Sequence, residues 1–337
     1  MKQSIVHIVD DASWGGVNRL LDCLENAPYG LLHDEHKVLR VTRGTRSAPK
    51  IEADIIVSHM SICWKNFPFF SSLRAAYPET PLIHVEHSYS ERYVALNVEK
   101  RERFDGLLNL SYALFDKIVA VSHSQCDWIL RRGYCQLEQL VTIPSCVSLA
   151  PFQRVANVIP EGPVTVGAIG RFHEQKGFDI LVEAFTRYLP DTMTLHLIGD
   201  GPEKAKLLRQ ARGKENIIFK ESTNLPAEAI SQCDIIAIPS RWEPYGLVAI
   251  EAMSALRLVM CAKVDGLKQH ISAGAIPVEE NTALGWAGAL RDFGEREAVD
   301  RLPRGTGIAG AEWNFINSWN LIASGLTTVE SVAQKAA

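Results

Sequence analysis

Short apolar runs alternate with longer amphipathic segments along almost the whole chain of 337 residues. The apolar runs are rich in Val and Ile without strict alternation, which is typical of strands in a parallel sheet covered on both faces. Predicted strands cover Ser4–Val9, Lys37–Val41, Ile55–Ser58, Leu82–Glu86, Lys117–Val121, Val141–Ile143, Val164–Ile169, Thr194–Ile198, Ile217–Phe219, Ile235–Ile238 and Leu258–Cys261. Predicted helices between them cover Val17–Glu25, Asn66–Ala76, Ser124–Arg132, Phe178–Tyr188, Pro202–Gly213, Pro226–Gln232 and Gly246–Ala255. This order predicts an α/β fold with two doubly wound, Rossmann-like parallel sheets.

The stretch near residues 150–163 is the best candidate for a domain boundary. It reads VSLAPFQRVANVIPEGPV with its flanks, and its Pro and Gly residues are typical of a loop. We therefore expect a first domain over residues 1–155, a second over 156–312, and a final segment over 313–337. Two such domains would face each other across a cleft, with ligands bound at the carboxyl ends of the strands.

Composition and charge exclude several classes of protein. The chain is 47% apolar and 22% charged, which are ordinary globular values. It carries 35 Lys and Arg against 39 Asp and Glu, so it lacks the basic surplus of a dedicated nucleic-acid binder, and we expect no nucleic-acid partner. No apolar run is long enough to cross a membrane, and the first residues do not resemble a signal peptide. Seven scattered Cys without a C-x-x-C pair indicate neither disulfides nor zinc, so we expect a cytoplasmic location.

The clearest motif is GRFHEQKGFDILVEAF, which runs from a strand through a polar turn into a helix. Arg171 and Lys176 are two cations in this turn, and Gly170 and Gly177 permit tight backbone geometry there. Cations at the start of a helix suit the binding of a diphosphate. The alternative is two solvated surface charges.

A second motif, PSRWEPYGLVAIEAMSA, follows a later strand. Glu243 lies in its turn, and a helix begins near Gly246, where unpaired backbone N–H groups could meet an anion. Glu251 interrupts the apolar face of that helix. A carboxylate there is suited to accept hydrogen bonds from neighbouring hydroxyls, and a salt bridge to an Arg is the alternative.

Together the G-R-x4-K-G run, the IGDGP run and the E-x7-E spacing resemble the family 4 retaining glycosyltransferases of the GT-B fold, also called glycosyl transferases group 1. The resemblance covers residues 164–271 best. It implies that the second domain binds a nucleoside-diphosphate sugar, with Glu251 on the ribose and Glu243 on the hexose. It further implies that the groups around the diphosphate are Arg171, Lys176 and the backbone of Gly246 and Leu247.

The first half resembles the acceptor domain of the same family. Gly15 and Gly16 follow the first strand, where the family has a glycine-rich loop facing the donor phosphate. His87 ends the strand LIHVEH, where the family places a His that points at the donor sugar; a capping or core histidine is the alternative. The resemblance also implies that a helix around Trp313–Ser324 crosses back to the first domain.

Four positions depart from the family pattern near the donor site. Leu256 and Asp265 stand where the family has Gly, Leu258 stands where it has Pro, and Gln269 stands where it has Glu. These changes leave donor choice open.

Two segments bear on the acceptor. The aromatic run CWKNFPFF and the cation-bearing segment at residues 40–50 could meet a lipid or an anionic acceptor, with core packing and a solvated loop as alternatives. Peripheral contact with the inner face of the cell membrane therefore stays open.

The predicted function is transfer of a hexose, with retention, from a nucleotide sugar to a glycan or lipid-linked acceptor, with His87 and Glu243 as the catalytic residues. The chain contains no D-x-D motif, so we expect no metal and no cofactor. Alternatives are a nucleotide-sugar epimerase or hydrolase, and a non-catalytic sugar-nucleotide-binding protein.

Overall fold

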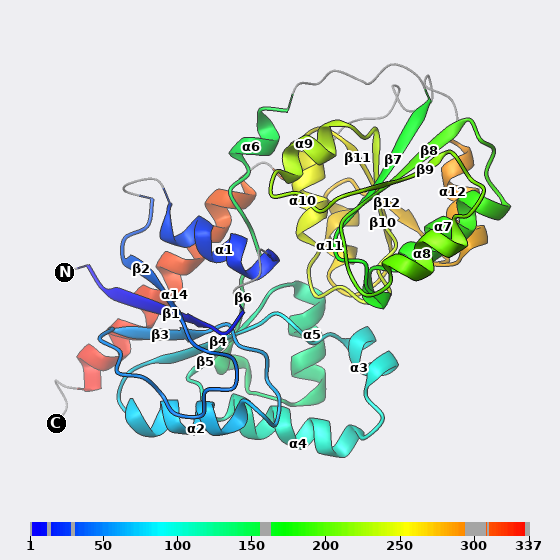
Figure 1. Ribbon diagram of the computed structural model, residues 1–337. Helices are drawn as coiled ribbons and strands as arrows, with labels where there is room; N and C mark the ends of the chain where they lie inside the picture. The colour runs from blue at the N-terminus through cyan, green and yellow to red at the C-terminus, as the bar shows by residue number, and fades with distance from the viewer. Residues whose placement is uncertain are drawn as a thin grey trace. The chain divides into compact units, whose positions relative to one another are not determined.

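The computed structural model describes residues 2–11, 15–27, 31–155, 163–293, 308 and 310–333. It divides into two compact units (Figure 1): Met1–Ser148 with Gly310–Ala337, and Leu149–Ala309. We call these the N-terminal and C-terminal units. In the stretch predicted as a boundary loop, a short helix, α6 (Ala150–Gln153), forms, and residues 156–162 lie outside the described part of the chain.

The N-terminal unit contains a six-stranded sheet of order β2-β1-β3-β4-β5-β6, in which neighbouring strands are parallel. The strands are β1 (Ser4–Val9), β2 (Glu35–Arg40), β3 (Ile55–Ser58), β4 (Leu82–Glu86), β5 (Lys117–Ala120) and β6 (Leu140–Thr142). The helices are α1 (Gly16–Glu25), α2 (Phe67–Ala76), α3 (Glu91–Asn97), α4 (Arg101–Tyr112), α5 (His123–Arg132) and α14 (Ala311–Ala333). Because the strands are parallel, the segments after β1, β3 and β4 emerge at the same edge of the sheet.

The C-terminal unit repeats this plan with a parallel six-stranded sheet of order β12-β11-β10-β7-β8-β9. Its strands are β7 (Val164–Ile169), β8 (Met193–Ile198), β9 (Ile217–Lys220), β10 (Ile235–Ile238), β11 (Leu258–Ala262) and β12 (Ile276–Val278). Its further helices are α7 (Phe178–Arg187), α8 (Lys204–Gln210), α9 (Pro226–Ser231), α10 (Leu247–Ser254), α11 (Leu267–Ser272) and α12 (Ala283–Arg291). The predicted α/β class with two parallel sheets is confirmed.

The sequence did not indicate β12, α3, α4, α11 or α12, and two of these elements have weak local signals. Strand β12 has three residues with Pro277 in the middle, and it forms at the edge of the sheet, where a missing N–H is tolerated. Helix α3 contains only seven residues, and its start depends on the Ser90 hydroxyl, which accepts a hydrogen bond from the Tyr93 N–H.

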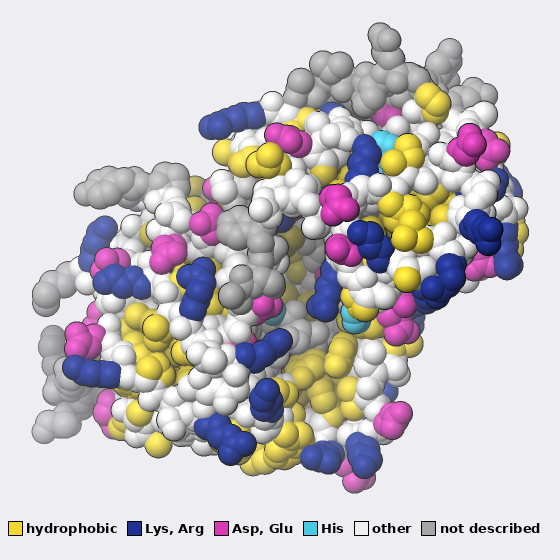
Figure 2. Space-filling model, in the orientation of Figure 1, with side chains coloured by type: hydrophobic (Ala, Val, Ile, Leu, Met, Phe, Trp, Pro, Cys, Tyr) yellow, Lys and Arg dark blue, Asp and Glu magenta, His cyan; other side chains and the backbone are white. Residues whose placement is uncertain are grey.

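The surface carries no dominant charge on the face that Figure 2 shows. Lys and Arg side chains are interspersed there with Asp and Glu. Within the aromatic run at residues 63–70, Phe69 and Phe70 are buried in the core, as core packing predicts, while Trp64 is exposed beneath the Arg103 guanidinium. Among the described helices, none combines the length and hydropathy needed to cross a bilayer.

Helix α14 is part of the N-terminal unit, although it lies at the other end of the chain. Trp319 is only 1% exposed and meets the rings of His7 and His36 edge-on, at centroid distances of 5.3 and 6.2 Å. Asn320 exchanges two hydrogen bonds of 2.9 Å with the backbone: it accepts from the His33 N–H and donates to the Leu31 carbonyl. The helix therefore packs against the sheet and is hydrogen-bonded to the segment that leads into β2.

A row of histidines crosses the N-terminal sheet from its edge toward its centre. His36 on β2 bonds His7 on β1, His7 bonds His59 after β3, and His59 bonds His87 after β4, each at 2.8 Å. We call these four residues the histidine chain. Burial lowers the pKa of His36 to about 4 against the attraction of Asp34, and lowers that of His87 to about 4 against Glu86. Burial and the neighbouring rings also hold the pKa values of His7 and His59 well below the usual range, so the chain is neutral at pH 7.

Replacement of Trp319 by Ala should lower the free energy of unfolding of the N-terminal unit by about 3–5 kcal/mol, because it leaves a large cavity between α14 and the sheet. Trp313→Ala is the matched control, since Trp313 lies on the same helix but is 61% exposed. Urea unfolding followed by circular dichroism measures both. Equal losses in the two variants would show that α14 does not depend on this contact.

The histidine chain should make folding sensitive to mild acid. Between pH 6.5 and about 4 the unfolded chain binds protons that the folded chain excludes, so stability is complete above pH 6.5 and falls as the pH drops through this window. Each such histidine contributes at most about 1.4 kcal/mol per pH unit. Urea unfolding at pH values across the window measures the slope. It should be shallower in His36→Ala and unchanged in His123→Ala, whose ring is exposed; a native chain equally stable at both ends of the window would refute this.

Candidate functional site

Two turns emerge side by side from the C-terminal sheet, because β7 pairs with β10. We call residues 170–177 the first turn and residues 239–246 the second turn. At their closest approach, a Cβ atom added to Gly177 would lie 2.1 Å from the Pro239 carbonyl oxygen, and Gly177 has a positive φ of 66°. Only glycine fits this position.

Hydrogen bonds fix the second turn to the first. The Arg241 N–H donates to the Gln175 carbonyl at 2.7 Å, and the Gln175 side chain donates to the Trp242 carbonyl at 3.2 Å. The Arg241 guanidinium forms two parallel bonds of 2.9 and 2.8 Å to the carboxylate of Asp179 on α7. Bidentate pairs of this kind add geometric definition, so the two turns form one braced structure.

Within this structure Lys176 of the first turn meets Glu243 of the second. The Lys176 Nζ lies 2.5 Å from Glu243 Oε2, and the Ser240 hydroxyl donates to the same oxygen at 3.1 Å. Glu243 is only 7% exposed. Arg171, by contrast, is exposed, and its side chain bonds none of the described residues. The structure thus joins Lys176 and Glu243 directly and leaves the Arg171 guanidinium open to solvent.

The second turn leads directly into α10. Gly246 precedes the helix with φ 99°, and a Cβ there would lie 2.6 Å from Leu267 Cδ2. The backbone N–H groups of Gly246, Leu247 and Val248 bond no described residue, so they remain available donors at the positive end of the helix. Glu251, one turn further along, is 1% exposed.

Two positions that depart from the family pattern have unusual backbone conformations. Leu256 has φ 54° and Asp265 has φ 38°, and both are in the region that favours glycine. The Asp265 carboxylate is buried and accepts a hydrogen bond from the Glu243 N–H at 3.2 Å. The next residue, Gly266, donates its N–H to the Glu243 carbonyl at 3.0 Å. Asp265 therefore holds the backbone of Glu243. Of the other departures, Gln269 is half-buried on α11 and Leu258 is buried on β11.

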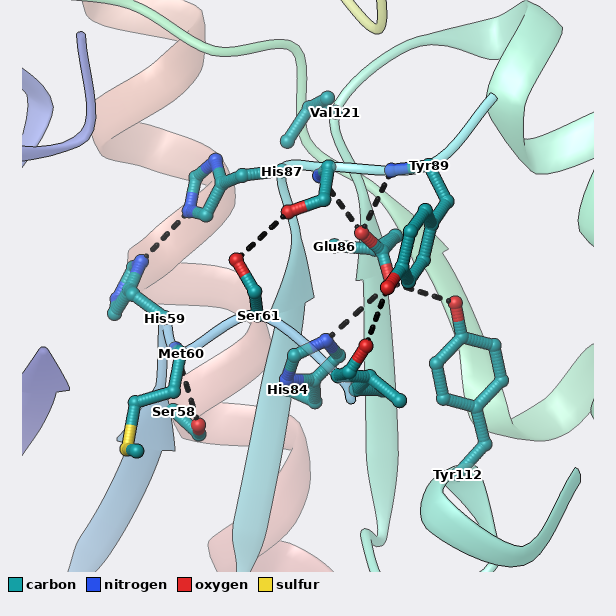
Figure 3. Close-up of polar contacts among 12 residues, drawn as sticks. Ser58, His59, Met60, Ser61, His84, Glu86, His87, Tyr89, Tyr112 and Val121 are labelled. Carbon is teal, nitrogen blue, oxygen red and sulfur yellow. Dashed lines mark hydrogen bonds and ion pairs between the residues drawn. The ribbon is translucent and has the colours of Figure 1, made fainter. Parts of the chain in front are cut away.

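In the N-terminal unit His87 follows β4 directly (Figure 3), and its Nε2 bonds His59 Nδ1. The preceding residue, Glu86, is buried and holds the turn: it accepts hydrogen bonds from the N–H groups of Ser88 (2.7 Å) and Tyr89 (3.0 Å) and from the Tyr112 hydroxyl (3.0 Å). Burial raises the pKa of Glu86, but His84 and these amides outweigh it and lower the pKa below its usual value.

Gly15 and Gly16 lie at the start of α1, after β1. Gly15 is the N-cap in an extended conformation and accepts from the Arg19 N–H at 3.1 Å, while residues 12–14 of the same loop lie outside the described residues. These two glycines and His87 belong to the N-terminal unit. The other predicted site residues belong to the C-terminal unit.

The sequence did not indicate the supporting residues. Ser240 and Arg241 lie within the second motif, and Asp265 is one of the departures from the family pattern, but nothing in the sequence shows what these side chains hold. Arg241 and Asp265 act through contacts with segments distant in the chain. The histidine chain has no sequence signature beyond each residue's place at or after a strand. In the described part of the chain, no group of three His, Cys, Asp or Glu residues is arranged to hold a metal ion.

Comparison with known sequences agrees with the C-terminal motifs. Residues 163–294 match the family model of glycosyl transferases group 1. The chain is 34% identical over 114 residues to granule-bound starch synthase 1 of Pisum sativum, a segment that is 32% of this chain and 19% of that protein. It is 31% identical over 121 residues to an uncharacterized 41.2 kDa protein in the cps region of Klebsiella pneumoniae, covering 35% of this chain and 33% of that one. The chain thus spans well under half the length of these relatives.

Solved structures resemble the whole chain. HepE of Anabaena in complex with UDP-glucose superposes with a TM-score of 0.71 at 17% identity, over 97% of this chain and 100% of that one. Sucrose-phosphate synthase of Thermosynechococcus elongatus superposes with a TM-score of 0.68 at 18% identity, over the full length of both. The chain therefore has the GT-B fold, and within it residues 163–294 are similar to the glycosyl transferases group 1 family.

Proposed function

We propose that this protein is a retaining glycosyltransferase that moves a hexose from a nucleoside-diphosphate sugar to a glycan or lipid-linked acceptor. The observation that carries the proposal is the contact between Lys176 and Glu243 beside the free amides of α10, within the residues that are similar to the glycosyl transferases group 1 family. This arrangement combines a cation, backbone donors and a buried carboxylate at one edge of the sheet.

The diphosphate would bind across the first turn and the start of α10. Arg171 supplies an exposed guanidinium. Lys176 has three N–H donors, so it can maintain its ion pair with Glu243 and also donate a hydrogen bond to a phosphate oxygen. The amides of Gly246 and Leu247 add donors at a helix N-terminus. These groups would stabilise the negative charge that develops on the leaving nucleoside diphosphate, and we propose that neither a metal nor a cofactor takes part.

The sugar and ribose would meet the two glutamates. Glu243, held by Lys176, Ser240 and Asp265, would accept hydrogen bonds from the hexose. Glu251 would accept them from the ribose hydroxyls. We further propose that His87 and the Gly15–Gly16 segment of the N-terminal unit face the donor, and that the leaving phosphate receives the acceptor's proton on the same face, which gives retention.

UDP-glucose is the first donor to test, because HepE was solved with it. Incubation with and without a mixture of glycan and lipid-linked acceptors separates three outcomes. Transfer only with acceptor supports the proposal, release of free sugar without acceptor indicates a hydrolase, and binding without turnover indicates a sugar-nucleotide-binding protein.

Arg171→Ala should weaken UDP binding roughly tenfold, since it removes a charge-assisted hydrogen bond of about 1.5–3 kcal/mol. Lys176→Ala should weaken it as well, but that variant leaves the buried Glu243 carboxylate without its cation. The double variant Lys176→Ala/Glu243→Gln removes charge from both partners and isolates the effect on phosphate. Calorimetric titration measures all three, with Arg187→Ala on the exposed surface of α7 as the control. Unchanged affinity in Arg171→Ala and the double variant would refute the phosphate assignment.

Substitution of the two glutamates should have different effects on ligand affinity and on transfer rate. Glu251→Gln should weaken UDP and UDP-glucose by a similar factor, roughly tenfold, because both ligands contain the ribose. Glu243→Gln should lower the transfer rate to a similar degree and leave UDP affinity almost intact. Titration of UDP into both variants, alongside transfer rates, tests this. Loss of UDP affinity in Glu243→Gln but not in Glu251→Gln would assign the ribose to Glu243 and the hexose to Glu251.

Asp265→Ala should destabilise the C-terminal unit by about 1–3 kcal/mol, since the buried Glu243 N–H loses its acceptor. Asp265→Asn keeps an acceptor oxygen and tolerates the positive φ, so it should retain most of the stability and of the transfer rate. Urea unfolding and transfer assays compare the two. If Asn and Ala were equally damaging, the charge of Asp265 rather than its hydrogen bond would be what matters.

A further inference from the structure

The histidine chain connects the predicted catalytic His87 to the edge of the N-terminal sheet. Each link joins Nδ1 of one ring to Nε2 of the next, in the order His36, His7, His59, His87. The two inner rings, His7 and His59, are buried, and both ring nitrogens of each are used within the chain. Two nitrogens remain at the ends: His36 Nε2 and His87 Nδ1 bond none of the described residues.

Hydrogen-bonding rules allow such a chain only two neutral states. A neutral imidazole has one N–H and one bare nitrogen, and every link needs one of each. If His87 carries its proton on Nε2, it donates to His59, so His59 must carry its own on Nε2, and so on to His36. In the other state all four rings carry the proton on Nδ1. Neighbouring rings therefore cannot choose their tautomers independently.

The surroundings keep the chain neutral. Trp319 covers His7 and His36 from α14, and no charged group bonds the inner rings. The charged or titratable groups nearby are Asp34 at the His36 end and Glu86 with His84 at the His87 end. A cation within the chain would force the rings on its two sides into opposite tautomers.

We propose that the histidine chain is a tautomer relay: its four rings share one tautomer, and together they set whether His87 Nδ1 accepts or donates a hydrogen bond. Switching moves one proton in at His87 Nδ1 and one out from His36 Nε2 to water, while each inner Nε2 proton passes to the Nδ1 of the next ring. No net charge remains in the sheet. His7, His36 and His59 are thus positioning residues for His87, and the assignment of His87 to the donor sugar rests on the proposed function.

The full chain, labelled with ¹⁵N-histidine and free of ligand, tests the relay without any assumption about activity. Long-range ¹H–¹⁵N spectra at neutral pH show which ring nitrogen carries the proton, and single substitutions assign the resonances. We expect His7, His36, His59 and His87 to be neutral and to share one tautomer. Opposite tautomers in neighbouring rings, or a cationic ring, would overturn the proposal.

Substitution at the far end tests transmission. His36→Ala should shift the ring ¹⁵N resonances of His87, whereas His123→Ala, on the exposed start of α5, should leave them unchanged. His36→Asn keeps a polar group near the former Nδ1 and covers the case in which the Ala variant does not fold; the three remaining rings should again share one tautomer. Unchanged His87 resonances in His36→Ala, or mixed tautomers in His36→Asn, would overturn the proposal.

Titration of UDP-glucose into the labelled chain separates the relay from the proposed function. Changes in the ring ¹⁵N resonances of all four histidines on donor binding support both the relay and the proposed function. Shifts at His87 alone would overturn transmission along the chain. If the donor does not bind, the proposed function fails, and the ligand-free spectra still decide whether the relay exists.

Discussion

The pairing of β7 with β10 is the constraint on which the candidate site depends. Lys176 and Glu243 are 67 residues apart in the sequence, and they meet because the two strands that precede their turns lie next to each other in the sheet. The glycine at 177 lets the turns approach, and the Arg241–Asp179 pair braces them. If β7 and β10 were not neighbours in the sheet, the two turns would lie apart and Lys176 could not reach Glu243.

The meeting of a lysine with a buried glutamate also explains the chemistry we propose. A buried carboxylate is costly unless it is paired and hydrogen-bonded. Glu243 satisfies that requirement through Lys176, Ser240 and Asp265, each from a different part of the unit. An arrangement that holds a charged acceptor in place before a ligand arrives is preorganised, and preorganised groups stabilise charge without reorganising during the reaction.

Much of the fold follows from local sequence patterns. The Val- and Ile-rich runs predicted eleven of the strands, and the helices expected between them form within a few residues of their predicted bounds. The glycine-bearing turns and the E-x7-E spacing likewise indicated where chemistry would lie. Among the missed elements, β12 and α3 are short and depend on the edge of a sheet or on one capping serine. Helices α4 and α12 were also missed, although they have 12 and 9 residues. The supporting residues could not be predicted, because Asp265 gains its role from a contact with Glu243 and the histidine chain from the order of four strands.

A crystal structure of the chain with UDP is the measurement that tests the central claim most directly. The account predicts a diphosphate within hydrogen-bond distance of the Gly246 and Leu247 amides and of the Arg171 guanidinium, with the Lys176 ammonium between a phosphate oxygen and Glu243. It also predicts the ribose on Glu251. A diphosphate bound elsewhere, with Lys176 and Glu243 joined as they are here and no ligand near α10, would contradict it.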